Sequence, residues 1–195
     1  MLERERVLLR HRPGPLPTHD APSRKRRAAQ PSVEDRGVHP EVERLIVALR
    51  LQPHPEGGWY RETFRSSEQV TTSRGTVRSA ATSIFFLLAT GIFSAFHRLA
   101  ADETWHFYRG DAVTIEEIEP SGRHERRVLG IDDALQTTIP SGTYFAAHVD
   151  APDGYALCGC DVAPGFEFAD FQLTTRSMLT AAYPHLGPLI AAYTR

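Results

Sequence analysis

Residues 96–110 read FHRLAADETWHFYRG, and they hold the densest group of potential metal ligands and proton-transfer groups in the chain. His97 and Glu103 stand on either side of a short segment that has the composition of a turn. Two strands joined there bring an imidazole and a carboxylate together across a hairpin, where they can share a proton or a metal ion. The stretch therefore predicts a β-hairpin that carries a candidate site.

Short β-like runs continue on both sides of this hairpin. They are separated by segments that carry proline, glycine, aspartate or serine, the residues that turns favour. The expected strands are residues 59–64, 79–88, 93–99, 103–108, 112–119, 125–129, 135–139, 143–149 and 155–162. About nine short strands at this spacing are typical of a sandwich or barrel, so the predicted class is all-β.

Helices are expected only at the two ends of the folded region. Proline and an acid at residues 40–41 resemble a helix start, and apolar residues then recur on one face, which predicts a helix over about 40–51. Residues 166–171 and 176–183 have the pattern of short helices or loops. Pro184 and Pro188 prevent a long helix at the C-terminal end.

Charge divides the chain into two parts. Residues 1–36 carry nine Lys or Arg against five Asp or Glu, together with five prolines, whereas residues 37–195 carry 13 basic and 19 acidic residues. We expect residues 1–37 to be a disordered or extended basic tail and residues 38–195 to be one folded domain. A solvated tail is the preferred interpretation over nucleic-acid binding.

The remaining composition is that of an ordinary globular protein, with 41% hydrophobic and 24% charged residues. No apolar run is long enough for a membrane helix and the first residues lack a secretory pattern, so a cytoplasmic location without a membrane partner is expected. The two cysteines, Cys158 and Cys160, point to the same face of a predicted strand. Buried structural cysteines are favoured over a role in lining a pocket.

Two landmarks together resemble the paired motifs of the cupin superfamily. His97, Glu103 and Gly110 stand where the first motif has its histidine, its glutamate and its closing glycine, and Pro140 and Gly142 match the turn of the second. The segments HPEGGWYRET (54–63), DETWHFY (102–108) and VAPGFEF (162–168) make the chain similar to the uncharacterised cupin-five branch of small single-domain cupins. The likeness covers about residues 39–185.

This resemblance implies a double-stranded β-helix, the cupin or jelly-roll barrel, with an N-terminal helix and short C-terminal helices. It also implies a homodimer. Members of the branch largely lack an assigned reaction, so the likeness informs the fold more than the function.

The chain departs from the metal-binding cupin pattern of three histidines and one glutamate. The resemblance places two of the four ligands at Leu99 and Phe145, whose side chains cannot coordinate a metal. No firm cofactor is therefore expected. A divalent metal (Fe, Mn, Zn or Ni) held by His97 and Glu103 with a displaced His106 or His148 is the alternative, although strand alternation points both of these away from the barrel.

The expected site combines proton-transfer groups with an aromatic pocket. His97 is the candidate general base, Glu103 orients it or acts as the acid, and Tyr60 or Tyr144 completes proton transfer. The expected substrate-binding residues are Glu62, Thr63, Trp105, Phe107, Gln136, Tyr144, Phe145 and Phe166, with Phe168 as a further pocket aromatic.

Three functions remain open at this point. The leading hypothesis is an enzyme that isomerises, epimerises or cyclises a sugar derivative or a secondary-metabolite intermediate by metal-independent acid–base chemistry. The second is a metal-dependent oxygenase or isomerase. The third is a non-catalytic protein that binds a small molecule.

The composition of the tail leads to a test by truncation. Deleting residues 1–36 is expected to leave the thermal unfolding temperature nearly unchanged, because basic, proline-rich sequence buries too little apolar surface to offset its ordering entropy. Calorimetry of the full and shortened chains measures this. A loss of several degrees would mean that the tail packs on the folded domain.

Overall fold

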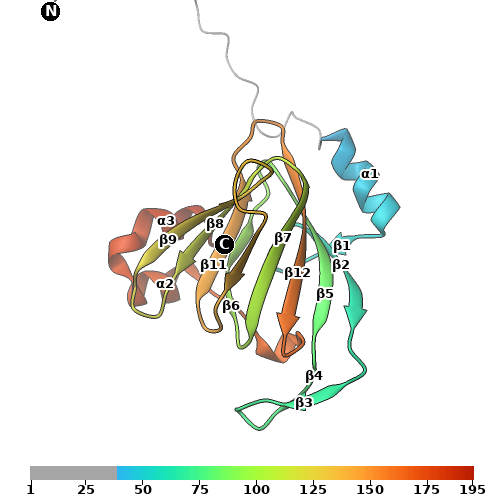
Figure 1. Ribbon diagram of the computed structural model, residues 1–195. Coiled ribbons are helices and arrows are strands. Elements are labelled where there is room, and N and C mark those ends of the chain that lie inside the picture. The colour runs from blue at the N-terminus through green and yellow to red at the C-terminus, as the bar shows by residue number, and fades with distance from the viewer. Residues whose placement is uncertain (1–38) are drawn as a thin grey trace, which may run out of the picture. The chain divides into compact units, whose positions relative to one another are not determined.

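The computed structural model describes residues 39–195, and Figure 1 shows that these residues form two large β-sheets with short helices beside them. The strands of one sheet follow the order β1-β2-β5-β12-β7-β10, and those of the other follow β13-β6-β11-β8-β9. All pairings between these strands are antiparallel. This arrangement confirms the predicted all-β class. The expected tail, residues 1–37, lies outside the described residues.

The bounds of the strands agree closely with the expected runs. The six-stranded sheet contains β1 (Gln52–Pro53), β2 (Trp59–Arg65), β5 (Thr82–Ala89), β7 (Asp102–Gly110), β10 (Gln136–Ile139) and β12 (Tyr155–Ala163). The five-stranded sheet contains β6 (Ser94–Leu99), β8 (Val113–Ile118), β9 (His124–Leu129), β11 (Tyr144–Val149) and β13 (Phe171–Leu173).

Side chains between the two sheets form the main core. On β5, Phe86 and Leu88 belong to this inner cluster, while Leu87 between them belongs to a cluster on the outer face. On β11, Phe145 points inward and Ala146 outward in the same way. The period of two along each strand therefore decides which residues reach the interior.

Helices cover the outer faces of both sheets (Figure 1). The N-terminal helix, α1 (Pro40–Leu49), packs Val42 and Leu45 against the six-stranded sheet. On the five-stranded sheet, α2 (Arg176–Ala182) and α3 (Gly187–Ala192) contribute Leu179 and Ile190. A short 3₁₀ turn, η3 (Pro184–Leu186), joins α2 to α3. None of the helices within residues 39–195 is long and apolar enough to cross a membrane.

The observed end of α1 comes two residues before the predicted one. The ring Nδ1 of His39 accepts a hydrogen bond from the Glu41 backbone N–H at 3.1 Å, and Pro40 occupies the first turn. Arg50 then takes up a left-handed conformation with φ of 52°, which ends the helix.

A hairpin made of β3 (Gln69–Thr71) and β4 (Val77–Ser79) was not predicted. The expected strand 79–88 is divided, because the chain bends at residues 80–81 and β4 pairs with β3 while β5 pairs with β2 and β12. Figure 1 shows this hairpin extending beyond the ends of the two large sheets. The expected loop or helix at 166–171 contains a 3₁₀ turn, η2 (Phe168–Asp170), followed by β13.

Packing of α2 on the five-stranded sheet provides a matched pair of substitutions. Leu179→Ala is expected to lower the free energy of unfolding by about 2–5 kcal/mol, because the side chain is 1% exposed and its removal leaves a cavity. Met178→Ala on the same helix, where the side chain is 49% exposed, is expected to change it by about 0.5 kcal/mol or less. Urea denaturation measures both, and equal losses would contradict the described packing of α2.

Candidate active site

A cavity of about 300 Å³ lies between the two sheets, a volume at the lower end of the ligand-pocket range. Five strands of the six-stranded sheet and two of the five-stranded sheet contribute to it, together with the segments 54–56 and 166–168. Its lining residues are Gln52, His54, Glu56, Tyr60, Glu62, Arg65, Thr82, Ile84, Phe86, His97, Leu99, Glu103, Trp105, Cys160, Val162, Phe166, Glu167, Phe168 and Phe171.

A tight turn delivers Glu56 into this cavity. The two residues after it are Gly57 and Gly58, with φ of 117° and 70°, a region that residues with a side chain rarely adopt. A Cβ atom on Gly57 would lie 2.1 Å from the Phe93 carbonyl oxygen, so the turn has no room for a larger residue. The Glu56 carbonyl accepts a hydrogen bond from the Ala95 N–H at 2.8 Å, which ties the turn to β6.

The Glu56 carboxylate is buried and fully engaged. Ser94 Oγ donates to Glu56 Oε1 at 2.9 Å, while His54 Nδ1 and His97 Nε2 each lie 3.3 Å from Oε2. Burial alone would raise the pKa of Glu56, but the charge of His97 and the hydrogen bonds of His54 and Ser94 lower it below its ordinary value. Glu56 is therefore a carboxylate held ionised inside the protein.

His97 is fixed by contacts at both ring nitrogens. Its Nδ1 lies 2.8 Å from the Ala95 carbonyl oxygen, which can only accept, so Nδ1 carries a hydrogen. Burial lowers the pKa of His97, while the charge of Glu56 and the hydrogen bond to Ala95 oppose that effect. A bare Nε2 lone pair facing a carboxylate at 3.3 Å is repulsive. One proton must therefore lie between Nε2 and Glu56 Oε2, and the two groups titrate as a pair.

Glu103 and Trp105 belong to β7, in the six-stranded sheet. Their surroundings differ from those of Glu56 and His97. Glu103 Oε2 and Trp105 Nε1 are buried, and neither has a hydrogen-bond partner among the described residues. Burial and the nearby charge of Glu56 raise the pKa of Glu103 to about 8, although contacts with Cys160 and Trp105 oppose the shift. At neutral pH this side chain is a carboxylic acid that can donate a hydrogen bond. Buried polar atoms of this kind normally have a partner, which a ligand or water bound in the cavity would supply.

The two cysteines lie in the interior as free thiols. Cys158 belongs to the core between the sheets, and burial raises its pKa to about 12. Cys160 lines the cavity, and burial followed by the charge of Glu103 raises its pKa well above the ordinary value. Both therefore stay protonated and are poor nucleophiles.

Aromatic rings surround the outer part of the cavity. Phe166, Phe168 and Phe171 lie with ring centroids 5.1–6.2 Å from one another. The Tyr60 ring meets the His54 ring edge-on at 4.6 Å. The cavity thus offers an apolar wall for a ring or carbon chain and polar groups farther in.

The expected site residues divide into two groups. His97, Glu103, Tyr60, Glu62, Trp105, Phe166 and Phe168 line the cavity, whereas Thr63, Phe107, Gln136, Tyr144 and Phe145 do not. Thr63 is exposed and donates to the Ser83 carbonyl at 3.1 Å, and Gln136 is exposed on β10. For these two residues the expected position in the pocket is wrong.

The other three residues pack away from the cavity. Phe107 packs against the inner core, and Phe145 is buried with its ring centroid 4.0 Å from that of His97. Tyr144 lies on the outer face, beneath the guanidinium of Arg98 and beside Tyr183. Tyr144 therefore cannot complete proton transfer in this cavity.

His54 and Glu56 were not predicted as site residues. The predicted β-hairpin is also wrong, because β6, which carries His97, and β7, which carries Glu103, belong to different sheets. We expected Glu103 as one orienting partner of the imidazole, but Glu56 holds that position. A signal was present in HPEGG, where a carboxylate between proline and two glycines marks a constrained turn.

Neither of the additional histidines proposed as metal ligands reaches the cavity. His106 Nε2 lies 3.0 Å from Asp161 Oδ2 on the outer face of the six-stranded sheet. His148 stacks on Tyr193 at 4.5 Å and contacts Glu116 and Asp150 on the outer face of the other sheet. Neither histidine therefore completes a metal site with His97 and Glu103 in this structure.

The residues of the cavity do not fit the metal centre of the general cupin pattern. Leu99 lines the cavity with an aliphatic side chain, and the imidazole Nε2 of His97 faces Glu56. Within residues 39–195 no three His, Cys, Asp or Glu side chains are arranged to hold a metal ion. We therefore derive no chemical step through a metal.

Comparisons with known proteins agree with the two-sheet architecture. The family model described as Cupin superfamily (DUF985) matches residues 43–174. A hypothetical protein from Leishmania major is 34% identical with a TM-score of 0.75, covering 78% of this chain and 97% of its own. A protein from Shewanella oneidensis is 39% identical with a TM-score of 0.73, covering 78% of this chain and 96% of its own. No curated protein matches the chain.

The raised pKa of Glu103 predicts a specific dependence of stability on pH. Between about pH 4.5 and 8 the folded protein keeps a proton that the unfolded chain has lost, so the contribution of Glu103 to stability falls as pH rises. Glu103→Gln does not titrate. Relative to the unsubstituted protein, its free energy of unfolding is therefore expected to gain about 4 kcal/mol between about pH 5 and pH 8.

Denaturant titrations at several pH values measure this difference. Carbon-13 NMR of the labelled Glu103 carboxyl reports the same proton directly, with an expected midpoint near 8. A midpoint at or below the ordinary 4.5 would contradict the neutral carboxylic acid.

Proposed function

The chain belongs to the cupin superfamily, in the branch described as DUF985, and from this premise we propose that it is an enzyme that moves protons on a small carbonyl compound. The observation that carries the proposal is the pairing of opposite proton-transfer groups in one cavity. An ionised Glu56 paired with His97 lies on one side, and a protonated Glu103 comes from the other sheet. Groups whose pKa values are driven apart by their surroundings are typical of acid–base catalysis.

The Glu56–His97 pair is the proposed base. Its carboxylate, Glu56, accepts a proton from the carbon next to the substrate carbonyl while His97 keeps both of its ring hydrogens, and the electron pair of the broken C–H bond moves towards the carbonyl oxygen. The Ala95 carbonyl keeps the proton on Nδ1 of His97, so proton exchange takes place between Nε2 and the carboxylate. The pair therefore acts without any rearrangement of the ring.

Glu103 and Trp105 are the proposed partners of the carbonyl oxygen. Glu103 Oε2 and Trp105 Nε1 are buried and have no hydrogen-bond partner among residues 39–195, so an incoming oxygen meets two donors that are already desolvated. Negative charge that develops on that oxygen strengthens both hydrogen bonds. Return of the proton to a neighbouring carbon, or to the opposite face with help from Tyr60, gives isomerisation or epimerisation. Attack of the carbanion on a second carbonyl carbon of the same molecule opens that C=O bond, and its oxygen takes up the proton, which gives cyclisation.

The size and lining of the cavity support a small, partly apolar substrate, such as a sugar derivative or an intermediate of secondary metabolism. A metal-dependent oxygenase or isomerase has less support, since the described residues do not bring the necessary ligands together. A non-catalytic binding protein needs the same cavity but no base. The experiment below therefore separates binding from proton transfer.

Proton exchange with deuterated water tests the proposal. Dihydroxyacetone, erythrulose and a set of uncharged aldo- and ketohexoses and their lactones are incubated with the protein in D₂O. Proton NMR is expected to show deuterium entering next to the carbonyl of at least one compound. His97→Ala, Glu56→Gln and Glu103→Gln are each expected to slow exchange by about 10²- to 10⁴-fold, the usual contribution of a proton-transfer group.

His106→Ala is the matched control, because it removes a histidine from the outer face of the same barrel. It is expected to retain the exchange rate. Full exchange by His97→Ala and Glu103→Gln would contradict the proposal, as would exchange abolished by a chelator. A co-purifying small molecule with no exchange on any compound would favour the binding protein.

A further inference from the structure

Charge at the mouth of the cavity is arranged in an unusual way. Four carboxyl side chains line the cavity, whereas Arg65 is the only guanidinium among the described lining residues. Two of the carboxylates, Glu62 and Glu167, belong to the outer part and are 39% and 48% exposed. The mouth therefore holds two acidic side chains and one basic side chain, that of Arg65.

The positive charge of Arg65 is already paired with carboxylates of the protein, so it is not available to bind a ligand. Its Nε and Nη2 donate to the two carboxylate oxygens of Glu62 at 3.0 and 2.7 Å, and its Nη1 donates to Glu167 at 2.8 Å. Nη2 also reaches the Phe166 carbonyl at 3.2 Å. The hydrogen bond and charge of Glu62 raise the pKa of Arg65, with Glu167 adding to the effect. We call this group of Arg65, Glu62 and Glu167 the mouth cluster.

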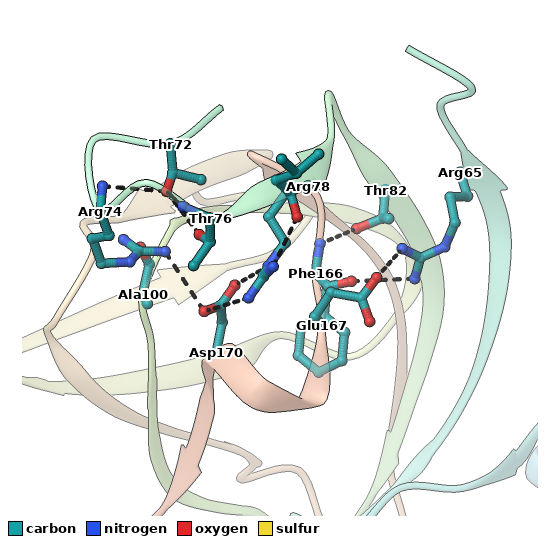
Figure 2. Close-up of polar contacts among 11 residues, drawn as sticks. Arg65, Thr72, Arg74, Thr76, Arg78, Thr82, Ala100, Phe166, Glu167 and Asp170 are labelled. Carbon is teal, nitrogen blue, oxygen red and sulfur yellow. Dashed lines mark hydrogen bonds and ion pairs between the residues drawn. The ribbon is translucent and has the colours of Figure 1, made fainter. Parts of the chain in front are cut away.

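A separate ion pair anchors the segment that carries Glu167. Figure 2 shows Arg78 and Arg74, from the β3–β4 hairpin, pointing at Asp170, while Arg65 approaches Glu167 from β2. Arg78 Nε lies 2.6 Å from Asp170 Oδ2. In addition to the two arginine contacts, the Phe166 N–H donates to Thr82 Oγ1 at 2.9 Å, which attaches the segment to β5 (Figure 2). The segment therefore stays attached when Glu167 loses its charge.

We propose that the cavity admits uncharged or positively charged molecules and rejects anions, and that the mouth cluster determines this selectivity. Arg65 is neutralised by Glu62, so the second acid, Glu167, leaves the mouth with an excess of negative charge. Farther in, Glu56 and His97 share a proton and Glu103 is neutral. The inner part of the cavity therefore has no unpaired positive charge that could bind an anion. The inference rests on the proposed function in treating this cavity as the place where substrate binds.

This selectivity narrows the substrate class. Sugar phosphates, nucleotide sugars and carboxylate-bearing metabolites are excluded, since each needs a cation that the cavity does not provide. Uncharged sugars, lactones and ketones fit, with the three phenylalanine rings beside their carbon skeleton. An ammonium group is also tolerated next to Glu167 and the exposed ring of Phe168.

Trp105 provides an internal reporter for the test. The chain has two tryptophans, so Trp59→Phe leaves the indole of Trp105 in the cavity as the single tryptophan, whose emission is excited selectively over that of the tyrosines. Three nitroxides with the same piperidine ring serve as quenchers: 4-hydroxy-TEMPO is uncharged, 4-amino-TEMPO is cationic and 4-carboxy-TEMPO is anionic. Each quenching constant is divided by that for free N-acetyltryptophanamide, which removes differences in intrinsic efficiency. Low ionic strength keeps the charges unscreened.

The uncharged and cationic nitroxides are expected to quench Trp105 about fivefold or more efficiently than the anionic one. Glu62→Gln with Glu167→Gln frees the charge of Arg65, so quenching by the anionic nitroxide is expected to rise about fivefold and quenching by the cationic one to fall. The two single substitutions are expected to give part of each change. Asp170→Asn is the matched control, because it weakens the anchorage of the segment without altering the charge of the lining.

Equal quenching by all three nitroxides, or strongest quenching by the anionic one, would overturn the charge selectivity while leaving the proposed proton transfer intact. If Asp170→Asn changed the quenching by the charged nitroxides as much as the double variant does, the role of the mouth cluster would be overturned. Failure of the uncharged nitroxide to reach Trp105 would instead contradict the proposed function, because a closed cavity admits no substrate.

Discussion

A carboxylate buried inside a barrel is the constraint on which the rest of the cavity depends. Glu56 loses its hydration there, and an unpaired buried charge is strongly destabilising. Ser94, His54 and His97 offset this cost, and in doing so they fix the direction of the His97 ring. The same negative charge helps to keep the proton on Glu103. One buried carboxylate thus serves two groups: it orients the His97 ring in one sheet, and it helps to keep Glu103 protonated in the other.

Much of the fold and part of the site follow from local sequence, because alternation along a strand is a property of the backbone. Glu103 and Trp105 point inward while His106 between them points outward, as the period of two in β7 requires. The direction of His148 follows from the same rule on β11. Proline and glycine also mark most strand ends, which is why the expected and observed strands agree.

The remainder depends on contacts that no local pattern encodes. Glu56 lies in a segment without periodicity and meets Ser94, 38 residues later, only after the barrel has closed. Arg65 and Glu167 are 102 residues apart. Thr63 points outward by simple alternation with Glu62, whereas the register shift between residues 62 and 64 of β2 brings Arg65 into the cavity lining. Such bulges and long-range ion pairs arise from tertiary packing, so they escape prediction from a single sequence.

Separate attachment of the segment 166–170 has an evolutionary consequence. Asp170 holds the segment to the β3–β4 hairpin, whereas Glu167 contributes charge to the mouth. Mutations at residues 62, 65 and 167 can therefore accumulate without detaching the segment or disturbing the interior groups. A barrel built in this way can diverge towards new ligands by a few neutral steps while its inner chemistry is inherited unchanged.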